Sequence, residues 1–318
     1  DPRDWFLTNA MKAQARESVN QGSGTKRMFS HAIFMPGMPG WLEKAEADHE
    51  NLKPDSFKGY TIGDNTNKQL SKHPWRLDDE KLLYPFYEKL AKWSKDKPSL
   101  ANVCVHKGLY PPSITQQYPH LLAYAKVDDV TKAAKDWPQL NFVIYHSAFR
   151  YTGGTWDIGW EQFRQSGRID WVTDLAQIPQ QTGVKNVYGD LGQIFAQSTI
   201  AEPRLCAAML GQLIQGLGAD HVVWGTDAIW TGSPQWQIEA LRRLEIPEDM
   251  QKRYGFNPLG AADGPVKNAI FGDNSARLYS FSTAQRAALA NDKIAVAKIH
   301  YDQFGDGRTN LRYGYMQA

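Results

Sequence analysis

Short apolar runs, rich in β-branched and aromatic residues, recur along the chain between longer segments in which apolar residues repeat every three or four positions. A continuous apolar run bounded by turn residues is typical of a strand that is buried on both faces of a sheet. This pattern predicts strands at residues 27–35, 56–62, 100–105, 142–145, 187–189 and 222–225.

The longer segments have the apolar spacing of amphipathic helices, and polar or glycine-rich stretches separate them from the strands. Asp128 or Asp129 is expected to cap one of these helices, at residues 127–135. The predicted helices cover residues 4–20, 41–53, 79–92, 127–135, 160–165, 171–180, 203–217, 234–243 and 265–271, and another begins within 274–279.

Strands that alternate with helices indicate βα units around a parallel sheet, so we predict an α/β fold of the (β/α)8 TIM-barrel type. Such a barrel has eight strands, and the six predicted strands fall two short. Because only helices follow the last strand, the shortfall lies on the N-terminal side. We expect the first two strands to precede Asp1; the alternative is a sheet that does not close.

The chain has 318 residues, which is enough for one large domain with a substantial core. Residues 1–282 are predicted to form the barrel domain, N-terminally incomplete. Residues 283–318 are predicted to be a peripheral, helical C-terminal extension.

Composition narrows the class of protein. The net charge of +2 gives no electrostatic reason to expect nucleic acid or an anionic membrane as a partner. No run of about 18 apolar residues is present, so we expect no membrane insertion and a soluble, cytoplasmic or periplasmic protein. Cys104 and Cys206 lie in a predicted strand and a predicted helix, and we interpret them as buried thiols.

Polar residues follow three of the predicted strands. His106 ends the strand at 100–105, His146 follows 142–145, and Asp227 follows 222–225. The C-terminal ends of parallel barrel strands point into one mouth, where such folds do chemistry. Two histidines and a carboxylate there predict a divalent-metal site. The alternative is that each histidine only bonds a neighbouring backbone group.

Four further residues are candidates for contact with a substrate. Lys107 follows His106 directly and could meet a substrate carboxylate, or it could be an ordinary solvated lysine. Asp190 follows the strand at 187–189 and could orient a ligand histidine. Arg76 and Trp230 lie on loops after strands and suit a planar anionic substrate, although they equally suit surface packing.

The same residues carry a resemblance to a known family. Val105-His106, Tyr145-His146-Ser147, Gly225-Thr226-Asp227 and the segment 270–279 resemble the amidohydrolase superfamily. The branch that they resemble most is amidohydrolase 2, which includes the aminocarboxymuconate-semialdehyde and resorcylate-type decarboxylases. The likeness covers most of residues 26–280.

The resemblance implies a TIM barrel of the metal-dependent hydrolase type, a small-molecule substrate and a homo-oligomer. It also implies one divalent metal, Zn²⁺ or Mn²⁺, held by His106, His146 and Asp227, with Asp227 as general base. Family members carry a His-x-His or Glu-x-His pair on their first strand, and this chain contains no His-x-His. Some branches place a carboxylated lysine on the strand equivalent to 56–62, but Lys58 lies near the start of that strand rather than at its mouth.

Three functions are consistent with these features. The favoured one is a hydrolase in which metal-activated water attacks an amide, ester or lactone carbonyl. The first alternative is a metal-dependent, non-oxidative decarboxylase of an aromatic or enoic acid, since one fold hosts both reactions. The second alternative is a non-catalytic barrel subunit that lacks a full metal site.

Overall fold

The computed structural model describes residues 7–63, 72–109, 118–150 and 156–304. Its centre is a six-stranded sheet in which each strand pairs in parallel with the next one along the chain. The strands are β1 (His31–Ile33), β2 (Ser56–Tyr60), β3 (Asn102–His106), β4 (Asn141–Tyr145), β5 (Val187–Asp190) and β6 (Val222–Val223).

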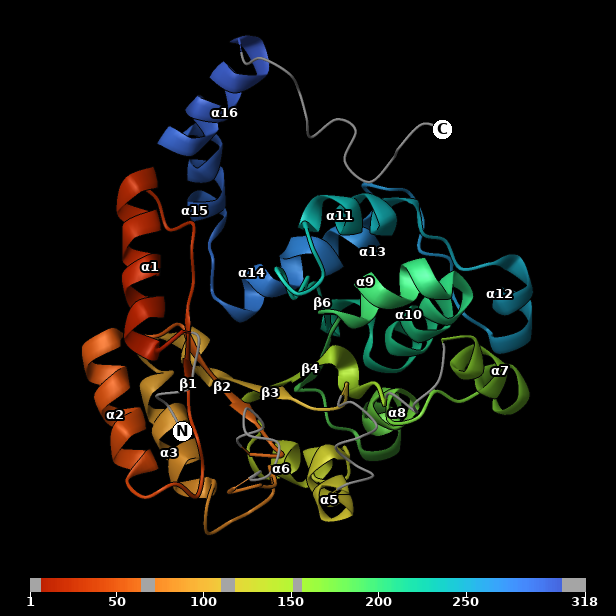
Figure 1. Cartoon of the computed structure of the whole chain (residues 1–318), viewed down its shortest axis with the longest axis horizontal. Coiled ribbons are helices and arrows are strands. Elements are labelled where there is room, and N and C mark those ends of the chain that lie inside the picture. Colours follow the sequence, from red (N-terminus) through yellow and green to blue (C-terminus); the bar gives the residue numbers. More distant parts are fainter. Residues whose placement is uncertain (1–6, 64–71, 110–117, 151–155, 305–318) are drawn as a thin grey trace.

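The sheet has the strand order of a TIM barrel, in which consecutive parallel strands are neighbours. Figure 1 shows the strands following an arc from β1 to β6, with most of the helices on the outer side of that arc. Within the described ranges β6 is not paired with β1, so the sheet has two edges. The predicted α/β architecture is confirmed.

Helices connect the strands and cover the sheet. They are α1 (Asn9–Ser23), α2 (Trp41–Leu52), α3 (Tyr84–Trp93), α5 (Leu122–Ala125), α6 (Val130–Asp136), α7 (Trp156–Ser166), α8 (Val172–Thr182), α9 (Ile194–Ala201), α10 (Pro203–Leu217), α11 (Pro234–Arg243), α12 (Glu248–Tyr254), α13 (Pro265–Asn268), α14 (Asn274–Leu278), α15 (Thr283–Ala288) and α16 (Lys293–Phe304). None of the described helices is long and apolar enough to cross a bilayer.

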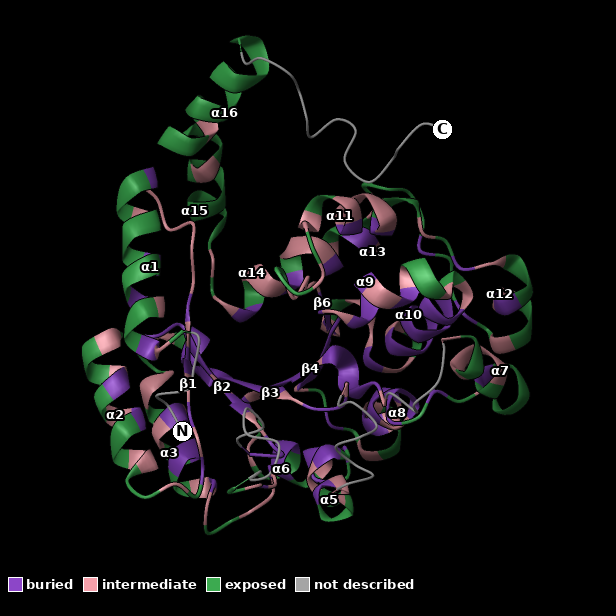
Figure 2. Cartoon of the chain, in the orientation of Figure 1, coloured by how far each residue is buried: buried purple, intermediate pink, exposed green. Residues whose placement is uncertain are grey.

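The core lies between the strands and these helices, as the purple strands of Figure 2 show. Helix α10 illustrates how it forms. The carboxylate of Glu202 accepts the backbone N–H of Arg204 at 3.3 Å, which caps the first turn. Further along, a side chain at Gly216 would meet the carbonyl oxygen of Ala176 at 2.1 Å. A glycine at this position therefore lets α10 pack closely against α8.

The first strand is shorter than predicted. Residues 27–30 are not part of β1, because the backbone N–H groups of Arg27 and Met28 both donate to Oδ1 of Asn20, each at 2.8 Å. The side chain of one α1 residue thus takes the place of a neighbouring strand. Local bonding of this kind competes with a sheet ladder and leaves no trace in an apolar pattern.

Three helices, α5, α9 and α12, were not predicted. The polar residues of α9, Gln197, Ser198 and Thr199, are consecutive and therefore point in different directions, so the helix lacks the single polar face on which the periodicity argument depends. The prediction that an aspartate side chain caps the helix at 127–135 is wrong. Asp129 precedes α6, but its carboxylate makes no capping bond. Both cysteines are free, buried thiols, as predicted.

The segment after α14 forms two helices rather than one. Ser282 begins α15 with a capping box, and α16 then extends away from the body (Figure 1). Arg27 donates two hydrogen bonds to the carboxylate of Asp292, at 2.8 and 2.9 Å, and so ties the start of α16 to the segment after α1. Helix α16 has no buried residue, and Ile299 and Phe304 are among its exposed apolar side chains (Figure 2).

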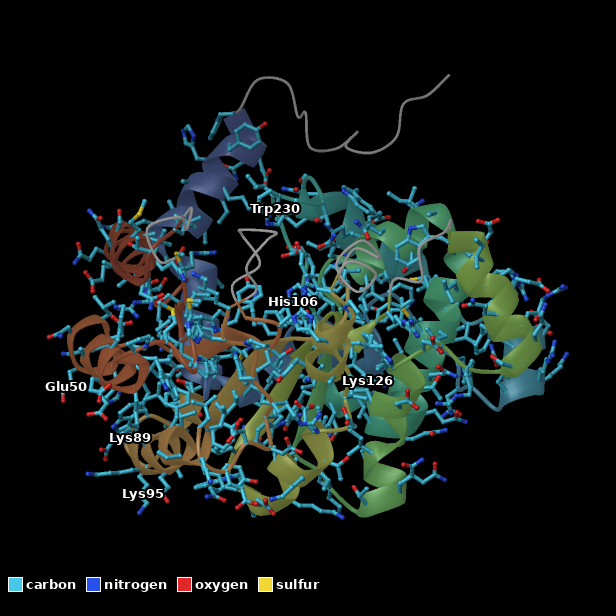
Figure 3. The ribbon with its side chains drawn as sticks, turned by 60° about the horizontal axis from the view of Figure 1, so that its bottom comes forward. Glu50, Lys89, Lys95, His106, Lys126 and Trp230 are labelled. Atoms are coloured by element: carbon cyan, nitrogen blue, oxygen red, sulfur yellow. The ribbon has the colours of Figure 1, made fainter. Side chains whose placement is uncertain are left out.

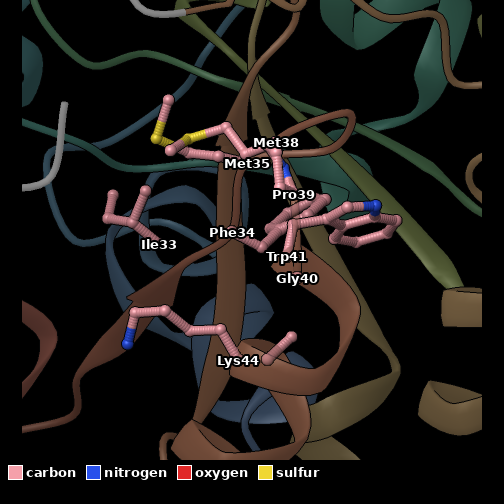
Figure 4. A pocket seen from close by; sticks show the side chains of 9 residues that line it. Ile33, Phe34, Met35, Met38, Pro39, Gly40, Trp41 and Lys44 are labelled. Carbon is pink, nitrogen blue, oxygen red and sulfur yellow. The ribbon is translucent and has the colours of Figure 1, made fainter.

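A small apolar hollow of about 60 Å³ lies where β1 leads into α2 (Figure 4). Phe34, Met35, Met38 and Trp41 form much of its wall. Lys44 is the charged residue on its lining, and its ammonium pairs with Asp48 at 3.1 Å. The hollow therefore lacks the converging polar groups that mark a catalytic pocket.

Candidate metal centre

His106 is the last residue of β3, and the turn that follows it fixes its ring. Nε2 of His106 lies 3.1 Å from the carbonyl oxygen of Gly108. Gly108 has φ +75°, and a side chain there would meet the backbone of Ala148 at 2.3 Å. A glycine is thus required for the turn after β3 to pack on the turn after β4. Figure 3 shows His106 near the centre of the molecule, whereas Glu50 and Lys89 lie on the outer helices and Lys95 in the turn after α3.

His146 begins the 3₁₀ turn after β4 and is 2% exposed. His146, Ser147 and Ala148 have φ values of 61°, 44° and 56°, in the left-handed region. A residue other than glycine pays about 1–2 kcal/mol of conformational free energy to adopt the left-handed conformation. Neighbouring bonds hold the turn, because Ser147 Oγ donates to the carbonyl of Asp190 at 2.8 Å. Strained backbone of this kind clusters at functional sites.

The two rings face each other. Nδ1 of His106 and Nε2 of His146 are 3.1 Å apart, and the ring centroids are 4.3 Å apart at 64°. Nδ1 of His146 lies 2.8 Å from the carbonyl oxygen of Gly192. Burial is the largest of the effects that hold the pKa of each imidazole below its ordinary value, so both rings are neutral at pH 7.

These contacts assign the tautomers. A carbonyl oxygen only accepts, so Nε2 of His106 and Nδ1 of His146 each carry the proton of a neutral ring. The two nitrogens that face each other then carry no proton, and each directs a lone pair toward the other ring. Lone pairs at 3.1 Å repel unless a cation lies between them. Imidazoles that bond a backbone carbonyl through their other nitrogen are typical metal ligands.

The spacing also fits a metal. Two nitrogens bound to one tetrahedral zinc at 2.0–2.1 Å would be about 3.3 Å apart, a few tenths of an ångström more than here. His106 and His146 therefore fit a divalent ion. Within the described ranges, however, no group of three or more His, Cys, Asp or Glu is arranged to hold a metal. The structure brings the two histidines together and does not bring Asp227 into bonding distance with them.

Asp227 follows β6 with φ 52°. Its carboxylate acts on His146 through space, since its charge is among the effects that raise the pKa of His146 and oppose the effect of burial. Its carbonyl oxygen accepts the backbone N–H of Trp230 at 3.1 Å. Asp227 thus lies on the same side of the sheet as the histidines, at the start of the loop that carries Trp230.

Asp190 supports His146, but not through the ring. Its carboxylate accepts the backbone N–H groups of His146 at 3.3 Å and of Gly192 at 2.9 Å. Burial raises the pKa of this carboxyl group, and the neighbouring His146 lowers it. A side chain at Gly225 would meet Oδ2 of Asp190 at 2.2 Å, so that glycine makes room for the carboxylate. Asp190 thus contacts His146 through the backbone and not through its ring, and its predicted role in orienting a ligand histidine stays a prediction.

Lys107 lies elsewhere. Its side chain is fully buried, and its ammonium contacts Asp129 Oδ1 at 3.0 Å and the carbonyls of Tyr124 and Lys126 at 3.0 and 2.6 Å. All three of its donors are used. Successive residues alternate across a strand, so the residue after His106 faces the helices and not the mouth. Lys107 is neither solvated nor available to a substrate.

Arg76 is also engaged with protein groups. It pairs with Asp78 at 2.9 Å and Asp128 at 3.3 Å, and it donates to the carbonyl of Ala123 at 3.2 Å. These bonds join the loop after β2 to the segment before α6. The guanidinium is therefore neutralised by two carboxylates, and the substrate contact that we predicted for it is not supported.

Trp230 is 72% exposed and stands on the loop beyond His106 (Figure 3). It lines a cleft of about 520 Å³ together with Leu109, Trp156 and Gln193. Leu109 directly follows Gly108, and Gln193 directly follows Gly192, the two residues whose carbonyls hold the histidines. The cleft is thus lined by residues next to the two glycines that hold the histidines, although neither histidine is itself on its lining, and its size is that of a small-molecule site.

Sequence reasoning missed the two glycine carbonyls that orient the rings. The sequence did hold a signal for them, because Gly108 lies two residues after His106 and Gly192 lies two residues after Asp190. It also missed Tyr60 and Tyr145, which lie opposite His106 on the neighbouring strands.

Comparison with known proteins places the chain in a family. The family model described as amidohydrolase matches residues 45–281, about three quarters of the chain. The chain belongs to the amidohydrolase family. It is an enzyme of the amidohydrolase type, and the resemblance inferred from its strand-end motifs is confirmed. No curated protein matches the chain at a significant level.

Solved structures of amidohydrolases and decarboxylases are similar in chain path. The 5-carboxyvanillate decarboxylase of Sphingomonas paucimobilis is 17% identical, with a TM-score of 0.46 over 86% of this chain and 71% of that one. An amidohydrolase of Burkholderia multivorans is 13% identical, with a TM-score of 0.49 over 87% and 81%. A dihydroxybenzoic acid decarboxylase of Polaromonas sp. JS666, solved with manganese and 2-nitroresorcinol, is 13% identical, with a TM-score of 0.46 over 87% and 77%. The family assignment rests on the family model alone.

Proposed function

We propose that this amidohydrolase is a metal-dependent hydrolase in which His106 and His146 hold one divalent ion, Zn²⁺ or Mn²⁺. The observation that carries the proposal is the pair of neutral rings whose Nδ1 and Nε2 atoms face each other at 3.1 Å, each ring being oriented by the carbonyl of a glycine. Such an ion supplies Lewis acidity, polarising a carbonyl oxygen and lowering the pKa of water toward neutrality.

The chain's own residues would do the rest. Asp227 takes a proton from the attacking water and returns it to the leaving group, the work of a general base and then a general acid. Asp190 holds the turn that carries His146. Trp156 and Trp230 provide flat apolar walls for the substrate in the cleft beside the pair. The substrate class is an amide, ester or lactone.

Decarboxylation of an aromatic or enoic acid is the second candidate. One observation favours it. The ammonium of Lys58 lies inside the arc of strands and contacts only aromatic rings among the described residues. An unpaired cation near the histidines suits a substrate that carries a carboxylate.

Activity before and after metal removal tests the proposal. The protein is stripped with a chelator, and one portion each is restored with Zn²⁺ and with Mn²⁺. Each portion is assayed for amide, ester and lactone hydrolysis and for CO₂ release from aromatic acids. We expect hydrolysis to disappear with the metal and to return with it. CO₂ release without hydrolysis would replace the proposed reaction with decarboxylation.

Variants assign the activity to the site. His146→Gln is expected to abolish activity, and Asp227→Asn to lower it by about 10²- to 10⁴-fold, the usual contribution of a general base. His120→Gln, on an exposed turn, is the matched control and should keep wild-type activity. Activity that survives in His146→Gln, or that is indifferent to chelation, would refute the proposal.

A further inference from the structure

Lys58 lies in the middle of β2, opposite Ile33 of β1 and Cys104 of β3. Its neighbours Phe57 and Gly59 face the helices. The Phe57 ring packs 5.2 Å from that of Phe86, and a side chain at Gly59 would meet Trp75 at 2.6 Å. Since side chains alternate along a strand, Ser56, Lys58 and Tyr60 point to the inner side of the arc.

The ammonium of Lys58 lies between two aromatic rings. It is 4.3 Å from the centre of the Tyr145 ring and 5.4 Å from that of Tyr60. Among the described residues, no carboxylate lies within ion-pair distance of it and no acceptor within hydrogen-bond distance. Aromatic faces attract a cation but do not neutralise its charge. Lys58 thus offers a positive charge that no described carboxylate compensates.

The same two rings connect Lys58 to the histidine pair. The Tyr60 ring is 5.2 Å from the His106 ring, and the Tyr145 ring is 6.3 Å from the His146 ring. Lysine's long side chain therefore carries its charge from mid-strand toward the mouth. From its place in the sequence, Lys58 was expected to lie away from the mouth. Its Cα does, but its long side chain reaches the rings beside the histidines.

Lys12 is a second positive charge near Lys58, and the neutral ring of His31 lies close enough to be affected by both lysines. Lys12 of α1 has its pKa lowered to about 8, by burial and then by the charge of Lys58. His31, at the start of β1, has its pKa lowered to about 3 by burial, Lys58 and Lys12, in that order. Asp48 and Asp55 oppose these charges at Lys12 and His31, but neither carboxylate pairs with Lys58, whose charge can therefore attract an anion.

We propose that Lys58 binds the carboxylate of an organic-acid substrate beside the histidine pair. The inference rests on the proposed function, because it places the anion next to the ion held by His106 and His146. Tyr60 and Tyr145 form flat walls on either side, which suits a planar acid. Phosphate groups are usually held by several converging donors, such as backbone N–H groups or arginines, and Lys58 brings one ammonium.

Binding of a matched pair of probes tests the assignment. Benzoate and benzamide have the same shape and differ in charge. Their affinities for the zinc-loaded full chain are measured by titration calorimetry, with inorganic phosphate as a third probe. The variants are Lys58→Met, Lys58→Arg and, as a control, Lys44→Met, whose ammonium already pairs with Asp48. Zinc content is measured on every sample.

We expect the wild type and Lys44→Met to prefer benzoate to benzamide. Lys58→Met should lose benzoate affinity by about 10- to 100-fold, the value of a hydrogen bond to a charged group, with benzamide binding and zinc content unchanged. Lys58→Arg should keep most of the preference. Benzoate binding unaffected in Lys58→Met, or a wild type that does not distinguish the two probes, overturns the inference.

Two other results have separate meanings. Phosphate bound more tightly than benzoate in a Lys58-dependent way would keep the anion site and replace the carboxylate by a phosphate group. A wild type that takes up no zinc but still shows Lys58-dependent benzoate binding would refute the metal proposal and leave the anion site standing.

Discussion

Nδ1 of His106 and Nε2 of His146 face each other at 3.1 Å, while the opposite nitrogen of each ring bonds the carbonyl of a glycine. The two glycines belong to the turns after β3 and β5, so three neighbouring strands orient one pair of side chains. The arrangement leaves two lone pairs directed at one point. This arrangement is the basis on which we propose metal binding.

Replacing Gly225 with alanine should disturb the pair without touching either ring. The new methyl group would overlap Oδ2 of Asp190 at 2.2 Å and displace the carboxylate that holds the backbone of His146. We expect a loss of about 1–3 kcal/mol in the free energy of unfolding, the usual cost of overpacking, together with weaker zinc binding. Urea denaturation and zinc titration measure the two effects.

Gly22→Ala is the control for that change. Gly22 lies in α1, and nothing is within 4 Å of the position its side chain would take. Alanine should raise stability there by about 0.5–1 kcal/mol and leave zinc binding unchanged. Equal zinc affinity in Gly225→Ala and in the wild type would contradict the supporting role of Asp190.

Lys107 should prove structural and not substrate-binding. Lys107→Met leaves Asp129 as an uncompensated buried charge, and we expect a loss of about 3–5 kcal/mol in the free energy of unfolding. Adding Asp129→Asn removes that charge while keeping an oxygen for the backbone N–H of Leu77, so the double variant should recover part of the loss. Chemical denaturation checks both.

An exposed pair provides the comparison. Lys252 and Glu248 are one turn apart on α12 and largely solvated. Lys252→Met should cost less than about 0.5 kcal/mol. If Lys107→Met were as mild as Lys252→Met, the buried pair would not be the structural element described here.

His31 should make stability depend on pH. Its pKa is about 3 in the folded chain and about 6.5 when unfolded, so the unfolded chain binds the extra proton between these values. Stability is therefore complete above about pH 6.5 and falls as the pH is lowered toward 3. Between pH 7 and pH 5 the wild type should lose about 1–2 kcal/mol more than His31→Gln, measured by urea denaturation. His120→Gln should keep the wild-type slope, and an equal slope in His31→Gln would contradict the assignment.

The last helices should depend on Arg27. Arg27 is bonded to Asp292 and to the carbonyl of Leu289, and Asp292 also accepts the backbone N–H of Ala295 in the first turn of α16. Arg27→Met should make residues 283–304 much more sensitive to limited proteolysis. Arg286→Met, which breaks an exposed pair with Asp273, should change it little. Equal cleavage in both variants would show that the Arg27 contact does not fasten the tail.

Much of the fold followed from the sequence because its signals are local. The apolar runs that became β3 to β6 are short and lead into polar residues, so their position and direction could be predicted. His106 and His146 could be paired because parallel strands bring their C-terminal ends to one side. The shortening of β1 could not be foreseen, since it depends on the side chain of Asn20, a residue of another element.

The substrate-side residues were harder to predict for the same reason. Lys107 and Arg76 were chosen by chain position, but their carboxylate partners, Asp129 and Asp128, come from a different βα unit. Lys58 was set aside on chain position, although its side chain reaches the level of Tyr60 and Tyr145. Partners that are distant in sequence decide where a long charged side chain goes.

The measurement that tests the central claim most directly is the metal content of the purified chain by elemental analysis. It compares the wild type with His106→Gln/His146→Gln, after both have been incubated with Zn²⁺ or Mn²⁺ and freed of excess ion. The account predicts about one zinc or manganese per wild-type chain and almost none in the double variant. A wild type that takes up no metal, or a double variant that retains it, would contradict the assignment of the histidine pair.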